Sequence, residues 1–224
     1  MEKNKIIDLM LETKIIPLFY EADSTIAFKL IDACYEGGAR VIEFTNRGDQ
    51  AEKVFADMIN YCKDKYPELA LGIGSISSPA QVNTFVELGA HFLVSPFIDE
   101  EIAMECKKLD KFWTGGCATL SEMHRAHKWG VPLMKAFPGN ILGPAFIKGA
   151  KAPCPWLKIM PTGGVQPTEE NLRSWFDAGA SCVGMGSKLF VKDENGDFQY
   201  DKITSLLKES IRIALKPNSE KSTG

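Results

Sequence analysis

The chain has 224 residues, of which 45% are hydrophobic and 25% charged, and its formal net charge is −3. This is enough apolar material for one large core, and the length suits a single α/β barrel as well as two smaller domains. We expect one domain. The charges are mixed in sign and form no dense basic run, which argues against nucleic acid or an anionic membrane as partner and favours a small-molecule substrate.

The six cysteines stand singly, without a Cys-x-x-Cys pair or a spacing typical of metal ligands, so we expect reduced thiols in the core. The N-terminal residues lack the apolar region of a signal peptide. No apolar run approaches the length of a membrane span. These features predict a soluble, cytoplasmic protein.

The hydrophobic pattern predicts a lead-in helix over residues 2–13 and then a strand followed by a helix, eight times over. The predicted strands cover residues 15–20, 40–45, 69–75, 90–95, 111–115, 132–137, 157–161 and 181–186. The predicted helices cover about residues 23–35, 48–65, 78–88, 99–109, 119–129, 141–149, 168–178 and 200–215. This alternation is typical of a (β/α)8 or TIM barrel. We predict one barrel domain over residues 1–215 and a disordered tail over residues 216–224.

The predicted strand at residues 132–137 carries a lysine among apolar residues. Because alternate side chains of a strand face the same way, Leu133, Lys135 and Phe137 share one face. Burial disfavours the charged form of lysine, and a neutral lysine is a nucleophile towards carbonyl groups. The alternative is a lysine whose stem lies along the strand while its ammonium group reaches water.

A carboxylate lies in the second predicted strand, where Glu43 shares a face with Val41 and Thr45. If this face points into the barrel, Glu43 can exchange protons with a buried lysine or with a substrate bound to it. The alternative is a structural Glu–Lys ion pair. Arg47 follows in the loop, where it is either a solvated cation or a clamp for a carboxylate.

Two glycine-rich stretches, Pro161–Val165 and Gly184–Lys188, follow the last two predicted strands. Backbone amides without side-chain bulk bind phosphate, and barrels commonly bind it after these strands. Ser187 adds a hydroxyl at the expected start of a helix. The alternative is that these glycines only form turns. No metal site is expected, because the three histidines (His91, His124 and His127) fall at a strand start and on an outer helix, and do not converge.

Six short motifs occur in one order along nearly the whole chain. They are Ile42-Glu-Phe-Thr-Asn-Arg47, Gly72-Ile-Gly-Ser75, Ser95-Pro96, Met134-Lys-Ala-Phe-Pro138, Pro161-Thr-Gly-Gly164 and Gly186-Ser187. Together they resemble the bacterial class I aldolases that act on 2-keto-3-deoxy-6-phosphogluconate (KDPG) and 4-hydroxy-2-oxoglutarate (KHG). The pairing of Glu-x-Thr-x-Arg with Lys-x-Phe-Pro is the most specific part of the resemblance.

The resemblance implies that Lys135 forms a Schiff base with pyruvate and that Glu43 moves protons as acid and base. It implies a homotrimer without metal or cofactor, which cleaves KDPG to pyruvate and glyceraldehyde 3-phosphate. Cleavage of KHG to pyruvate and glyoxylate is a second activity that the resemblance leaves open. Arg47 and Ser75 would hold the pyruvate carboxylate, although the family usually has threonine at the latter position. The substrate-binding residues implied in this way are Arg47, Thr45, Ser75, Pro96, Phe137, Thr162, and, for the phosphate, Gly163, Gly164, Gly186 and Ser187.

The chain departs from the family pattern around the expected mouth of the site. It has Gly115-Gly116 in place of Pro-Gly, Phe97 in place of glycine, and Gly139-Asn140 in place of Ala-Glu. These departures leave the aldehyde half of the substrate and its C4 configuration open. Two other readings stay open: another phosphate-binding barrel, either an isomerase or a synthase, and a non-catalytic barrel that binds a phosphorylated metabolite.

Overall fold

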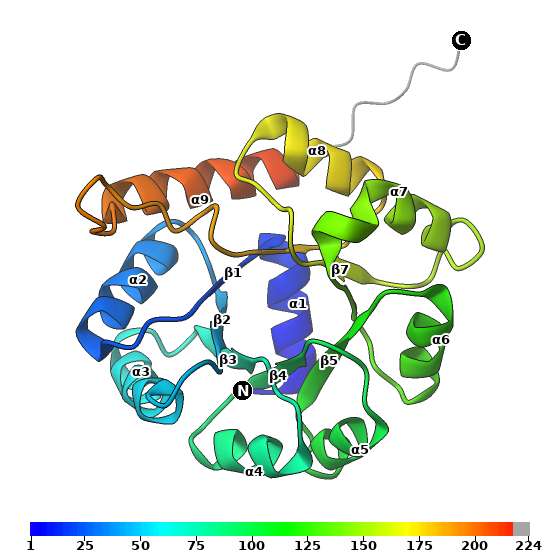
Figure 1. The fold of residues 1–224 in the computed structure, drawn as a ribbon, viewed down its shortest axis with the longest axis horizontal. Coiled ribbons are helices and arrows are strands. Elements are labelled where there is room, and N and C mark those ends of the chain that lie inside the picture. The colour runs from blue at the N-terminus through cyan, green and yellow to red at the C-terminus, as the bar shows by residue number, and fades with distance from the viewer. Residues whose placement is uncertain (217–224) are drawn as a thin grey trace.

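The computed structural model describes residues 1–216, and its centre is a barrel of eight parallel strands (Figure 1). The strands are β1 (Ile15–Phe19), β2 (Val41–Thr45), β3 (Ala70–Gly74), β4 (Phe92–Ser95), β5 (Phe112–Cys117), β6 (Met134–Ala136), β7 (Ile159–Pro161) and β8 (Val183–Met185). They are hydrogen-bonded in the order β7-β6-β5-β4-β3-β2-β1-β8, and a parallel bridge between Thr162 and Gly184 joins the two outer strands. The predicted (β/α)8 barrel is confirmed.

The first helix precedes β1, and the others alternate with the strands and form the outer ring in Figure 1. The helices are α1 (Lys3–Thr13), α2 (Ser24–Glu36), α3 (Ala51–Lys65), α4 (Pro79–Glu87), α5 (Glu100–Lys108), α6 (Leu120–Lys128), α7 (Gly139–Lys151), α8 (Glu169–Asp177) and α9 (Tyr200–Leu215). Local sequence sets several of their starts, because Asp23, Asp99 and Thr119 accept hydrogen bonds from the free backbone amides of the first turns of α2, α5 and α6.

The lead-in helix α1 closes the end of the barrel at which the strands begin, and it lies at the centre of the ring in Figure 1. Its residues Ile6, Ile7 and Met10 are buried against a layer of side chains that point into the barrel. That layer consists of Ile16, Val41, Ala70, Phe92, Val94, Phe112, Leu133, Met160 and Cys182. Because this end is filled with apolar groups, a substrate site is expected at the opposite end, where the strands finish.

Several segments differ from their predicted extent. The strands expected over residues 157–161 and 181–186 are reduced to β7 (Ile159–Pro161) and β8 (Val183–Met185). The strand expected over residues 132–137 is reduced to β6 (Met134–Ala136). The helix expected over residues 141–149 runs from Gly139 to Lys151 as α7, and it contains a non-helical residue, Gly143, directly before Pro144. Proline lacks the amide hydrogen of a helix interior, so the helix bends there.

Three expectations concern the ends and the class of the chain. The predicted disordered tail lies outside the described residues, except for Lys216. The assignment of residues 1–215 to one domain stays a prediction. Over residues 1–216, no helix has both the length and the apolar character needed to cross a membrane.

Candidate active site

Lys135 lies in the middle of β6 and points into the barrel. Leu133, two residues earlier, belongs to the interior layer, so the alternation of a strand directs both side chains inward. The lysine is 5% exposed, and its Nζ lies 4.9 Å from the centre of the Phe137 ring. An amine in such a dry setting, with one aromatic face beside it, suits reaction with a carbonyl group better than a solvated lysine does.

Glu43 reaches the same interior from β2. Its neighbour Val41 is in the interior layer, and Glu43 is only 3% exposed. Burial raises the pKa of this carboxyl, and the charge of Lys135 acts in the opposite direction. Both side chains lie in the barrel interior, but among the ion pairs of the described residues none joins Glu43 to Lys135.

A glycine beside Glu43 creates the space that the carboxylate fills. Gly74 lies opposite Thr45 in the β2–β3 ladder, and a Cβ built on it would lie 1.9 Å from Glu43 Oε1. Real Cβ atoms do not approach an oxygen so closely, so only glycine at position 74 leaves Glu43 in this place. Thr45, 8% exposed, continues the same inward face towards the strand ends.

The residues expected to hold a carboxylate lie in the loops after β2 and β3. The backbone amide of Asn46 donates to the carbonyl of Gly74 at 2.9 Å, which ties the two loops together. Ser75 is half-buried and has a positive φ of 63°, an uncommon backbone conformation for a residue other than glycine. Arg47 is exposed in the loop after β2, at the end of the barrel where the strands finish, and among the described residues it forms no ion pair with Glu43.

The loops after β4 and β5 form another side of the mouth. The Pro96 carbonyl oxygen would lie 2.1 Å from a Cβ at Gly116, so these two segments pack backbone against backbone. The next residue, Phe97, is 45% exposed. A large apolar side chain therefore lies at the surface here, where the family pattern has glycine.

A cavity of about 290 Å³ lies at the ends of β7 and β8, and one of its lining residues, Phe137, has its ring 4.9 Å from Lys135 Nζ. Its lining residues include Phe137, Thr162, Gly163, Gly164, Gly186 and Ser187, so the structure brings together the predicted phosphate-binding residues. The φ angles of Gly163 and Gly164 are 95° and 74°, which a side chain would strain. The Thr162 hydroxyl is buried and has no hydrogen-bond partner among the described residues, which is uncommon for a buried polar group.

Some details of this cavity differ from the sequence analysis or were not anticipated by it. Ser187 does not start a helix: it lies in a turn over residues 187–189, and the next helix begins at Tyr200. Leu18, Gln166 and Lys188 also line the cavity. Leu18 could have been found from its spacing of two from the inward Ile16, and Lys188 from its place directly after Ser187.

The histidines do not form a metal site. The Nδ1 atom of His91 accepts a hydrogen bond from the Leu71 amide at 3.0 Å, and burial lowers the pKa of His91 to about 4. In residues 1–216, no group of three or more His, Cys, Asp or Glu side chains is arranged to hold a metal ion. His124 and His127 lie on α6, on the outer ring.

Comparison with known protein families identifies the family of this chain. The profile of the KDPG and KHG aldolases matches residues 6–206. The chain belongs to the KDPG/KHG aldolase family. It is therefore a class I aldolase, a carbon–carbon lyase that releases an aldehyde, and the predicted family and reaction class are confirmed.

Characterised members of the aldolase family are similar over most of their length. The 2-dehydro-3-deoxy-6-phosphogalactonate aldolase of Escherichia coli K12 is 30% identical over 161 residues, which cover 71% of this chain and 76% of that protein. The KHG/KDPG aldolase of the same organism is 29% identical over 204 residues, covering 89% and 92%. The KDPG aldolase structure of Legionella pneumophila, with pyruvate captured as a covalent carbinolamine, has 26% identity and a TM-score of 0.79, and the match covers 89% and 95% of the two chains.

Proposed function

We propose that this aldolase cleaves KDPG to pyruvate and glyceraldehyde 3-phosphate, and that Lys135 and Glu43 carry the reaction. The observation that carries the proposal is the arrangement of three features in one lumen. A buried lysine and a buried carboxylate both point into the barrel, and Phe137, whose ring lies 4.9 Å from Lys135 Nζ, also lines a glycine-rich cavity at the ends of β7 and β8. The first two fit the keto-acid half of the substrate, and the cavity fits a terminal phosphate.

The proposed reaction begins at Lys135. Its neutral amine attacks C2 of the substrate, and loss of water gives an iminium that accepts electrons from the neighbouring bond. Glu43, as a carboxylate, takes the proton from the C4 hydroxyl while the C3–C4 bond breaks, which releases the aldehyde and leaves an enamine on Lys135. Glu43 then returns a proton to C3, and water hydrolyses the iminium to free pyruvate and lysine.

The surrounding residues fit supporting roles. Arg47 and Ser75 would hold the C1 carboxylate from the loops after β2 and β3, and Thr45 and Pro96 would line the keto-acid half. Phe137, whose ring lies near Lys135 Nζ, would keep water from the imine. The phosphate would be bound by the remaining predicted residues, which line the cavity: Thr162, Gly163, Gly164, Gly186 and Ser187.

Relatives support this assignment, and their names include the other candidate substrates. The Legionella pneumophila relative holds pyruvate covalently, and a Zymomonas mobilis relative, 25% identical with a TM-score of 0.78, was solved with 3-phosphoglycerate. One Escherichia coli relative is named for the phosphogalactonate substrate and another for KHG and KDPG. The two phosphorylated sugar acids differ in configuration at C4. KHG, which yields glyoxylate, is the second candidate substrate for the same lumen.

The test has two parts. Pyruvate with borohydride should inactivate the enzyme irreversibly and add mass to the peptide that contains Lys135, while Lys135→Ala should take up no label. A cleavage assay with KDPG, its C4 epimer, KHG and unphosphorylated 2-keto-3-deoxygluconate should then give the highest kcat/KM for KDPG. Label on another lysine would overturn the role of Lys135, and a higher kcat/KM for the epimer or for KHG would overturn the substrate assignment.

Assembly and location complete the proposal. The family resemblance suggests a homotrimer, which sedimentation equilibrium would test directly. The six cysteines are free and five of them are buried, which suits the reducing cytoplasm. Fractionation of the source cells, with the enzyme followed by its aldolase activity, would test the location.

A further inference from the structure

The cavity at the ends of β7 and β8, which Gly163, Gly164 and Gly186 help to line, is called the glycine cavity below. Among its lining residues in the described structure, Lys188 is the only charged one. It is exposed, and it forms no ion pair with another residue of the described chain. Its charge is therefore not neutralised by a neighbouring carboxylate. A cation left without a partner at the entrance of a polar cavity is positioned to meet an anion that arrives from solvent.

The backbone at Lys188 is held in place, although its side chain is free. The amide of Leu189 donates to the carbonyl of Gly186 at 2.9 Å, which closes a turn around residues 187 and 188. The next two residues, Leu189 and Phe190, are 0% and 8% exposed and anchor the turn in the core. Lys188 thus starts from a fixed position at the edge of the cavity and has a flexible stem that can reach into it.

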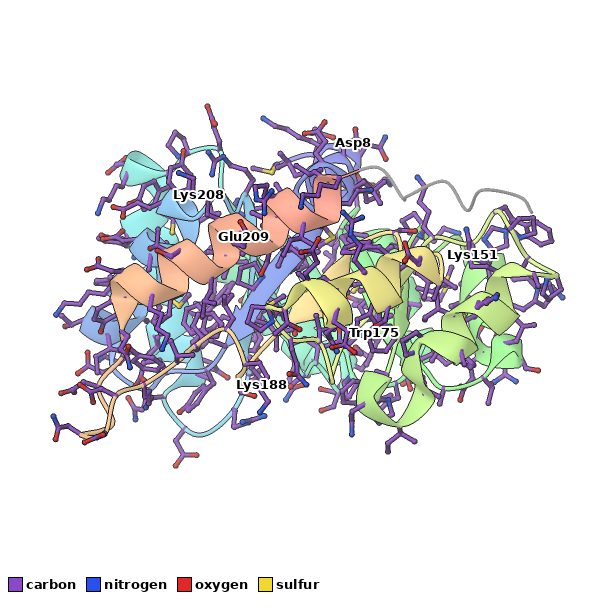
Figure 2. The ribbon with its side chains drawn as sticks, turned by 90° about the horizontal axis from the view of Figure 1, so that it is seen from above. Asp8, Lys151, Trp175, Lys188, Lys208 and Glu209 are labelled. Carbon is purple, nitrogen blue, oxygen red and sulfur yellow. The ribbon has the colours of Figure 1, made fainter. Side chains whose placement is uncertain are left out.

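Lys188 also lies at the end of the barrel where the candidate active site is. Helix α1 closes one end of the barrel, and its residue Asp8 lies near the top of Figure 2. Lys188 lies in the lower half of the same view, away from Asp8. Lys208 of α9 lies on the side nearer to Asp8. Lys188 is therefore at the end where the strands finish, together with Thr162 and the glycines.

The rest of the cavity lacks charge of its own. Its lining includes the backbone of Gly163 and Gly164, the hydroxyl of Ser187, and Thr162, whose hydroxyl is buried without a partner among the described residues. Asn140, which lies against Gly163 and Gly164, is neutral at a position where the family pattern has glutamate. Neutral donors of this kind bind a phosphate or a carboxylate, whereas an added cation favours the more highly charged of the two.

We infer that Lys188 is a specificity-determining residue, whose ammonium group closes over the terminal phosphate of the substrate and selects doubly charged phosphate over a carboxylate or a hydroxyl. This inference rests on the proposed function of the site. Lys188 takes no part in the covalent steps at Lys135. Its effect is expected in KM and in anion binding, not in imine formation.

The experiment compares Lys188→Ala and Lys188→Arg with wild type, and uses Lys208→Ala as a matched removal of an exposed lysine. Lys188→Ala should lower kcat/KM for KDPG by about 5- to 10-fold, mainly through KM, and weaken inhibition by inorganic phosphate by a similar factor. Cleavage of 2-keto-3-deoxygluconate should change less than about twofold. Lys188→Arg should recover most of the loss, and Lys208→Ala should behave like wild type.

Two controls separate this inference from the proposed function. Trapping of pyruvate by borohydride should be the same in wild type and Lys188→Ala, since it reports only on the imine. Direct titration of the wild type and Lys188→Ala with inorganic phosphate tests the cation even if KDPG is not the preferred substrate. Equal phosphate affinity in the two proteins, an equal fall for phosphorylated and unphosphorylated substrates, or a failure of arginine to restore selectivity would each overturn the inference.

Discussion

The carboxylate of Glu43 occupies the space that a side chain on Gly74 would need, since a Cβ at Gly74 would lie 1.9 Å from Glu43 Oε1 and 2.7 Å from its Cδ. The two residues are on neighbouring strands and both face the lumen. The position of the proposed acid–base group thus depends on the absence of a side chain on the next strand. In this respect Gly74 belongs to the candidate active site, although it contributes no functional group.

Gly74→Ala should therefore damage the reaction more than the fold. The methyl group would push Glu43 away, and because the closest atom is the end of a flexible side chain, the barrel should remain folded. We expect exchange of the pyruvate methyl protons to slow by about 10²-fold or more. NMR would follow the exchange in deuterium oxide, with Tm from circular dichroism as the check on folding.

Gly149→Ala is the matched control for that change. Gly149 lies in α7 and has no atom within 4 Å of a built Cβ, so alanine there should leave exchange unchanged and, by its higher helix propensity, leave Tm equal or slightly raised. If Gly74→Ala exchanged protons as fast as Gly149→Ala, the displacement of Glu43 would have no catalytic consequence.

Glu43→Gln tests the carboxylate itself. The amide keeps the shape of the side chain and loses its basicity, so borohydride trapping of pyruvate should persist while methyl proton exchange falls by about 10²- to 10⁴-fold. Exchange within about threefold of wild type would remove Glu43 from the proposed mechanism. Loss of trapping would instead assign Glu43 to imine formation.

The same variant should also change how stability depends on pH. Burial raises the pKa of Glu43, so the folded protein holds this proton more tightly than the unfolded chain does. Wild type therefore loses stability as pH rises from the ordinary glutamate value, about 4.3, through the raised pKa, and a glutamine cannot lose a proton. The difference in Tm, Glu43→Gln minus wild type, should be near zero at low pH and grow more positive towards neutral pH.

Glu209→Gln gives the opposite sign and serves as the control. A hydrogen bond from Arg212 lowers the pKa of Glu209, so here wild type gains stability as pH rises and the glutamine variant should fall behind. Thermal melts of all three proteins between pH 4 and pH 8 would show the two trends. A negative difference for Glu43→Gln at neutral pH would mean that attraction to Lys135 outweighs the cost of burial.

The order of strands and helices could be predicted from the sequence because it depends on local rules. Apolar residues recur every second or every three to four positions, and Gly38, Gly89 and Gly179 end helices with φ angles of 102°, 100° and 102°, each directly before an alanine that leads to the next strand. The same alternation along β6 and β2 predicted which residues share a face with Lys135 and Glu43, but it left open whether that face points into the barrel.

Other features depend on contacts between distant segments and could not be predicted in this way. The place of Gly74 beside Glu43 requires the register of β2 against β3. The bend of α7 has a local signal in Pro144, whereas the turn over residues 187–189, found where a helix start was expected at Ser187, has no such signal. The lack of a partner for the Thr162 hydroxyl is a property of the folded cavity and has no signal in a single sequence.

Thr162→Val exploits this last feature, because it should raise stability and lower activity together. The Thr162 hydroxyl is buried at the bridge to Gly184 without a hydrogen-bond partner, and an unsatisfied buried polar group costs about 1–3 kcal/mol. Valine has nearly the same shape without this cost, so Tm should rise by roughly 2–4 °C or more. If the hydroxyl binds the substrate, kcat/KM for KDPG should fall by about tenfold.

Thr114→Val is the control for this prediction. The Thr114 hydroxyl donates to the Leu133 carbonyl at 2.7 Å, so its removal should lower Tm. A fall in Tm for both variants would mean that Thr162 is satisfied within the protein, and an unchanged kcat/KM would exclude its hydroxyl from substrate binding.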